Sequence, residues 1–138
     1  MFVDADLARD KSNRHSQTGV LIFINKASIN WYIKRQETVE ASTFGAELCA
    51  IKAGVEMAES LHYNLRMIGV PIDGSANVFC DNEAVYKNKI TPESVLNKKN
   101  HYIAYHRCRE AVATKNIMVA KQVTDNNISA LFTNIMTE

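Results

Sequence analysis

The order of β-rich and helical segments is the feature that most constrains what this chain can fold into. Three β-rich segments come first: residues 1–6, the apolar run TGVLIFIN (18–25) and the alternating run SINWYIK (28–34). Residues 10–16 and the pair Asn25 and Lys26 suit the turns between them. The chain is therefore expected to begin with three strands in succession.

A long helix is predicted after these strands. Ser42 and Thr43 suit a helix N-cap, and apolar residues recur at helical spacing until Gly69 and Pro71, which end a helix. The later segments are a strand at 77–82, a short helical stretch from residue 83, a helix around 101–114, a strand at 117–123 and a helix at 126–136. This alternation, without a linker or a repeat, indicates a single α/β domain over residues 1–138.

Net charge is uninformative about partners, whereas cysteine content excludes some classes of protein. The chain has 16 Lys and Arg against 15 Asp and Glu, so no overall field points to a nucleic acid or a membrane. Cys49, Cys80 and Cys108 lack the paired spacing of a zinc site or a disulfide framework, which favours reduced thiols and an intracellular, cytoplasmic location. No apolar run is long enough to span a membrane, and no secretory signal is present. Met1 lies directly at a strand edge, which suggests a piece of a longer protein.

Acidic residues fall at the ends of the predicted elements. Asp4 lies in the first strand, Glu47 lies early in the long helix, and Asp81 follows the strand VFC. Ligands of open α/β sheets bind beyond the carboxyl ends of strands, which favours Asp81 as a site residue. Asp4 and Asp6 share one strand face, so a metal site needs at most one of them. The alternative is that each acid is local: a solvated strand end, or a complement to the helix dipole.

Four stretches of the chain resemble the ribonuclease H domain at the end of copia-type retrotransposon Pol polyproteins. They are VDADLARDKSNRHSQTGVLIFIN, NWYIKRQETVEASTFGAELCAIK, VFCDNEAV and LNKKNHYIAYHRCREAV, and they cover nearly the whole chain in the family's order. The resemblance implies a ribonuclease H-like fold with a mixed five-stranded sheet flanked by helices. It also implies an endonuclease that cuts the RNA strand of RNA–DNA hybrids, joined to an upstream polymerase domain of the same polyprotein and located in the element's virus-like particle.

By the same resemblance, Asp4, Glu47 and Asp81 are the catalytic carboxylates and hold two Mg²⁺ ions, for which Mn²⁺ can substitute. Asp4 would bridge both ions, and the other two would complete the side of the leaving group. Mg²⁺ prefers oxygen ligands, and two-metal sites stabilise both the attacking and the leaving oxygen of an in-line displacement.

The last predicted helix departs from the family pattern. The segment ISALFTN has Ala130 where the family has a fourth acidic ligand, and Asn134 where a Lys is usual. Asp125 lies too far away in sequence to be a good substitute. The alternative function is therefore a catalytically impaired ribonuclease H-like remnant, which binds nucleic acid or is purely structural.

Candidate contacts to the hybrid complete the sequence-based hypotheses. The predicted substrate-binding residues are Arg14, Ser16, Thr18, Lys34, Arg35 and Asn82. The cations would neutralise phosphates, and the hydroxyls of Ser16 and Thr18 would bond a 2′-hydroxyl. A solvated face is the alternative for the cations. Trp31 is expected to pack in the core or on the sheet, and the pair His101 and His106 is expected to have a surface or packing role rather than to bind metal.

Overall fold

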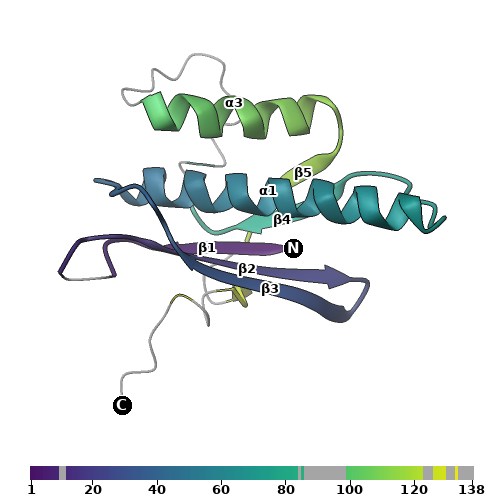
Figure 1. Cartoon of the computed structure of the whole chain (residues 1–138), viewed down its shortest axis with the longest axis horizontal. Coiled ribbons are helices and arrows are strands. Elements are labelled where there is room, and N and C mark those ends of the chain that lie inside the picture. The colour runs from purple at the N-terminus through teal and green to yellow at the C-terminus, as the bar shows by residue number, and fades with distance from the viewer. Residues whose placement is uncertain (10–11, 84, 86–98, 123–125, 130–132, 134–138) are drawn as a thin grey trace.

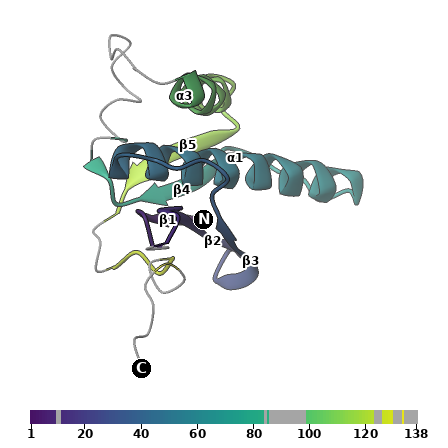
Figure 2. The same ribbon diagram turned by 60° about the vertical axis from the view of Figure 1, so that its left-hand side comes forward.

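The computed structural model describes residues 1–9, 12–83, 85, 99–122, 126–129 and 133. Within these residues, five strands form one mixed sheet, and a long helix lies along one of its faces (Figure 1). A second helix lies over the first. The view turned by 60° shows the same three layers, with α3 above α1 and α1 above the sheet (Figure 2).

The sheet has the strand order β3-β2-β1-β4-β5. Its strands are β1 (Phe2–Asp6), β2 (Gln17–Ile24), β3 (Ala27–Arg35), β4 (Ala76–Cys80) and β5 (Ile117–Lys121). The first three strands pair antiparallel, whereas β4 runs parallel to both β1 and β5. Because β1 and β4 run parallel, their carboxyl ends lie at the same edge of the sheet.

The two long helices are α1 (Thr43–Met67) and α3 (Lys99–Ala113). Helix α1 begins where the side chain of Ser42 accepts a hydrogen bond from the backbone N–H of Gly45, which satisfies one of the orphan donors of the first turn. Its buried face packs on β1, where a Cβ atom on Gly54 would lie 2.9 Å from Val3 Cγ2. The absence of a side chain at Gly54 therefore lets the helix approach the strand closely.

The described elements confirm most of the predicted ones to within a few residues. All five strands are present, and α1 has the predicted N-cap and ends just before Gly69. The predicted helical stretches from residue 83 and over 126–136 lie mostly outside the described residues. None of the helices in the described ranges is both long and apolar enough to cross a membrane.

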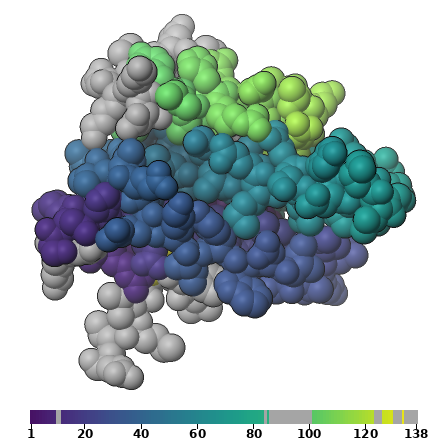
Figure 3. Space-filling view, in the orientation of Figure 1, coloured from purple at the N-terminus to yellow at the C-terminus, as the bar shows by residue number. Residues whose placement is uncertain are grey.

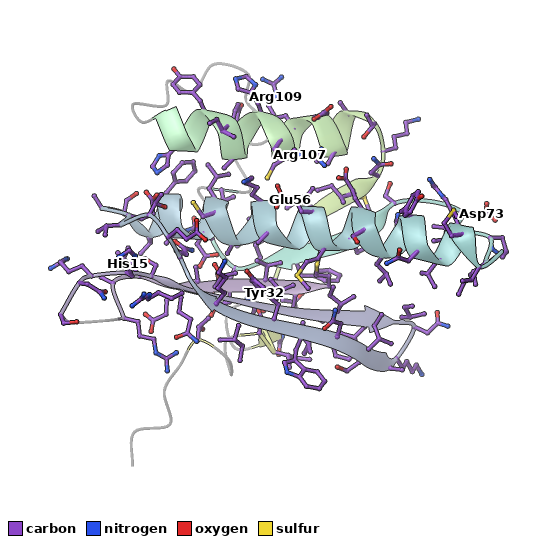
Figure 4. All side chains as sticks on the ribbon, viewed as in Figure 1. His15, Tyr32, Glu56, Asp73, Arg107 and Arg109 are labelled. Atoms are coloured by element: carbon purple, nitrogen blue, oxygen red, sulfur yellow. The ribbon has the colours of Figure 1, made fainter. Side chains whose placement is uncertain are left out.

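Trp31 is expected in the core or on the face of the sheet, and its 65% exposed side chain excludes the core. The reason is topological, because β3 is an edge strand and alternation directs only one of its faces toward α1. Tyr32, on the next position, lies on the face toward α1 and is half-buried against the core (Figure 4). Trp31 therefore lies on the sheet surface.

Candidate metal centre

Three carboxylates from separate elements converge at one edge of the sheet. Asp4, Glu47 and Asp81 each offer one oxygen atom, and these atoms all lie within 4.8 Å of one another. Asp4 comes from the middle of β1, Glu47 from the second turn of α1, and Asp81 from the residue directly after β4. In Figure 4 this edge is on the side of His15, and Asp73 marks the opposite end of the molecule.

The local structure explains why these side chains meet. The carboxyl ends of β1 and β4 share one edge, and α1 starts above that edge because its N-cap is at Ser42. Glu47 is tied to the sheet, since its Oε1 accepts a hydrogen bond of 3.2 Å from the backbone N–H of Ala5. Asp4 and Glu47 are buried, and Asp81 is half-buried.

Bringing three acids together without a cation is electrostatically unfavourable. Burial and then the nearby charges of Asp4 and Asp81 raise the pKa of Glu47 to about 9. Burial also raises the pKa of Asp4, with further contributions from Asp81 and Asp6, against the opposing hydrogen bond from Thr133. Cations relieve such repulsion, so the cluster suits a bound metal.

One buried oxygen atom of this cluster has no hydrogen-bond partner in the described part of the chain. Glu47 Oε2 accepts no hydrogen bond from any of the residues that the structure describes. Buried polar atoms are nearly always paired, so an orphaned carboxylate oxygen facing two other acids fits a ligand atom for a hard cation. The described cysteines and histidines form no comparable cluster with acids.

A fourth oxygen at this site was missed by sequence analysis. The hydroxyl of Thr133, which is 1% exposed, donates a hydrogen bond to Asp4 Oδ2. Thr133 lies three residues after Ala130, so the i, i+3 spacing of the predicted last helix is a signal that points to it. Ala130, Asp125 and Asn134 lie outside the described residues.

The predicted hybrid contacts divide into exposed and buried groups. Arg14, Lys34 and Arg35 are exposed, and Lys34 forms an ion pair of 3.1 Å with Glu37. Asn82, beside Asp81, accepts a hydrogen bond from the backbone N–H of Val85 through Oδ1, as a helix cap does.

Ser16 and Thr18, the predicted contacts to a 2′-hydroxyl, are not exposed in this structure. Both residues are buried, and their hydroxyls are engaged inside the protein. Ser16 Oγ accepts from the backbone N–H of Ala8, and Thr18 Oγ1 accepts from Gln36 Nε2 at 3.0 Å. These hydroxyls therefore stabilise the segments that flank β2.

A second buried acid that the sequence did not point to, Glu40, is paired with a histidine. Glu40 Oε2 lies 2.7 Å from His101 Nε2, and both side chains are almost fully buried between α3 and the segment before α1. A Cβ atom on Gly45 would lie 2.5 Å from His101 Nε2, so only glycine leaves room for the pair. His106 is exposed and its ring stacks on Tyr102. Neither histidine joins the carboxylate cluster.

The outer surfaces of the helices carry ion pairs of their own. Arg107 extends from α3 toward α1, where it pairs with Glu59, and Arg109 lies over the ring of Tyr105 (Figure 4). The space-filling view shows α1 as a band between α3 and the strands, so much of its outer side is open to solvent (Figure 3).

The chain is similar in sequence to segments of two plant transposon polyproteins, although no family model matches it. It is 30% identical over 98% of its length to the retrovirus-related Pol polyprotein from transposon TNT 1-94 of Nicotiana tabacum. It is 24% identical over 96% of its length to that from transposon RE1 of Arabidopsis thaliana. The chain spans only 10% and 9% of these two relatives.

Solved structures show the same fold at low sequence identity. The chain is similar to ribonuclease H1 of Halobacterium salinarum NRC-1, with a TM-score of 0.64, 15% identity, and coverage of 92% of this chain and 88% of that one. LC11-RNase H1 in complex with an RNA/DNA hybrid matches with a TM-score of 0.63 and 13% identity, and the match covers 91% of this chain and 86% of that one. The protease-reverse transcriptase of prototype foamy virus matches with a TM-score of 0.59 and 13% identity, and the match covers 99% of this chain but only 20% of that one.

Proposed function

Because the chain is a homologue of a segment of retrotransposon Pol polyproteins and has the ribonuclease H fold, we propose that it hydrolyses the RNA strand of RNA–DNA hybrids. The observation that carries this proposal is the convergence of Asp4, Glu47 and Asp81, with one Glu47 oxygen left without a partner among the described residues. A purely structural remnant has no need to keep three mutually repelling acids at one edge of its sheet.

Two Mg²⁺ ions, or Mn²⁺ in their place, would activate the attacking water and stabilise the leaving oxygen of an in-line displacement at the scissile phosphate. The residues that would hold them are Asp4, Glu47 and Asp81. Rigid elements carry all three, since β1, α1 and the end of β4 belong to the packed centre of the fold. The backbone N–H of Ala5 orients the Glu47 carboxylate toward the other two.

The proposed substrate has a phosphate backbone on both strands, so exposed cations near the carboxylates would position it. Arg14, Lys34 and Arg35 are the candidates, together with Asn82 beside Asp81. Phosphate contacts carry no base information, and we expect affinity that is independent of sequence and that falls as salt rises. The upstream partner would be the polymerase of the same copia-type polyprotein.

The test is cleavage of an end-labelled RNA–DNA hybrid in the presence of Mg²⁺ and, separately, of Mn²⁺. We expect cleavage of the RNA strand alone by the natural chain, and a loss of at least about a hundredfold for Asp81→Asn, equivalent to about 2.7 kcal/mol of barrier. Equal rates for the natural chain and Asp81→Asn, or no cleavage with either metal, would contradict the proposal.

Ala130 adds a second arm to the same assay. If the resemblance assigns this position correctly, Ala130→Asp restores an acidic ligand and raises the cleavage rate at least about tenfold, or about 1.4 kcal/mol, with a lower metal requirement. Ala130→Asn is the matched control, because it adds similar bulk without a charge. Identical rates for all three chains would show that this position does not limit activity.

A further inference from the structure

We propose that Thr133 is a positioning residue of the metal centre, whose hydroxyl fixes the orientation of the Asp4 carboxylate toward Glu47 and Asp81. This inference rests on the proposed function, since it assumes that the three acids hold a cation. It assigns a role to a residue near the far end of the chain, 129 positions from the acid that it contacts.

The contact is buried and directional. Thr133 is 1% exposed and Asp4 is 8% exposed, and the Thr133 hydroxyl donates to Asp4 Oδ2. A carboxylate on a short side chain can rotate about its terminal bond, and a bound donor restricts that rotation. The bond to the ionised acid is charge-assisted, which makes it stronger than a bond between neutral groups.

Three further bonds hold the residues around this contact. Arg9, which follows β1, donates from Nη1 to the backbone carbonyl of Thr133 itself. Asn127 donates from Nδ2 to the carbonyl of Val3 at 3.1 Å, and Val3 is the residue directly before Asp4. Asn127 is in turn held by the hydroxyl of Ser129, 2.6 Å from its Oδ1. Asn127 and Thr133 therefore contact the chain on either side of Asp4, at Val3 and at Arg9.

The alternative is that Thr133 only stabilises the fold. Another threonine of the chain, Thr38, serves as a matched control for that alternative. Thr38 Oγ1 donates to Glu40 Oε1 at 3.0 Å, so it too is a threonine hydroxyl bonded to a buried acid. Glu40, however, is paired with His101 and lies outside the carboxylate cluster. Removing either hydroxyl costs a comparable hydrogen bond, but only one of the two changes should alter cation binding.

The experiment is a calorimetric titration of the natural chain with MnCl₂, without nucleic acid, beside Thr133→Val, Thr133→Ser and Thr38→Val. We expect Thr133→Val to weaken Mn²⁺ binding about tenfold, Thr133→Ser to bind within about twofold of the natural chain, and Thr38→Val to bind as the natural chain does. Melting temperatures in a chelator report the structural cost of each change separately.

Each outcome supports or overturns a specific statement. Unchanged Mn²⁺ affinity in Thr133→Val overturns the role of Thr133, whereas no Mn²⁺ binding by the natural chain overturns the proposed function and this inference with it. Weakening by Thr38→Val as large as by Thr133→Val also overturns the role, because the effect is then general. If Thr133→Val does not fold, Arg9→Met removes the bond to the Thr133 carbonyl, and it should weaken binding about threefold; unchanged binding overturns the inference.

Discussion

Glu40 and Glu47 are two buried glutamates only seven residues apart, but their surroundings are opposite. Glu40 has a partner at each oxygen, because Oε2 faces His101 and Oε1 accepts from Thr38. Glu47 faces two other acids, and its Oε2 has no partner within the described residues. The same residue type at similar depth is therefore a structural group in one place and a candidate ligand in the other.

This difference separates stability from function. A buried acid with all its partners in place is compatible with a stable fold, but removing any one partner destabilises the fold. A buried acid that faces other acids destabilises the empty fold, and it is useful only when a cation neutralises it. The two glutamates should consequently respond differently to substitution and to metal.

The largest expected effect is on the pH dependence of stability without metal. The pKa of Glu47 is raised to about 9 from 4.5, so this group favours folding at low pH, and that contribution is lost as pH rises toward 9. The raised pKa of Asp4 acts in the same direction. In a chelator, we expect the free energy of unfolding to fall between pH 5 and pH 9 with a slope of up to about 1.4 kcal/mol per pH unit for each such proton.

Urea unfolding over that pH range measures this slope, and a substitution assigns it. Glu47→Gln removes the titrating group and should flatten the curve. Saturating Mg²⁺ should flatten it too, because a bound cation favours the ionised acids. A curve that stays equally steep in Glu47→Gln would mean that the raised pKa has no counterpart in solution.

The next effect is the loss of stability when the paired glutamate loses its partner. His101→Ala leaves Glu40 buried without its ring partner, and we expect a loss of about 3 kcal/mol in the free energy of unfolding at neutral pH. His106→Ala is the matched control on the same helix, since His106 is exposed, and it should cost less than about 0.5 kcal/mol. Similar losses in both variants would show that the Glu40 pair contributes nothing special.

The sequence predicts the elements well because their signals are local. β-rich composition, with alternation in the third segment, marks the first three strands, and the N-cap at Ser42 and the stop at Gly69 bound α1 within a residue or two. The strand order cannot be predicted in this way, because no local pattern encodes that β1 lies between β2 and β4. The expectation of a mixed five-stranded sheet came from the resemblance to a family.

The site divides in the same way. Asp4, Glu47 and Asp81 each have an adequate local explanation; their positions only allowed a shared site, and the family resemblance favoured it before the structure brought them within 4.8 Å. Glu40 and His101 are separated by 61 positions, so their pairing depends on how α3 packs over α1. Long-range contacts of this kind leave no periodic trace in a single sequence.

The smallest expected effect concerns Cys49, a neighbour that responds to the charge of Glu40. Its Sγ lies 3.9 Å from Glu40 Oε1, and burial first, then the Glu40 charge, raise the pKa of this thiol to about 11. Because the thiolate is the reactive form, alkylation of Cys49 by iodoacetamide should be slow at neutral pH and should rise only well above the range of a free cysteine. Peptide mapping by mass spectrometry over a pH series separates Cys49 from Cys80 and Cys108, which are buried.

Glu40→Gln removes the charge but not the burial, so it should shift the midpoint of Cys49 alkylation downward while leaving it above that of free cysteine. The matched change Glu47→Gln should leave the midpoint where it is, because Glu47 is not among the groups that shift this thiol. If Glu47→Gln moved it as far as Glu40→Gln does, the two glutamates would share one electrostatic environment, and the contrast between them would be wrong.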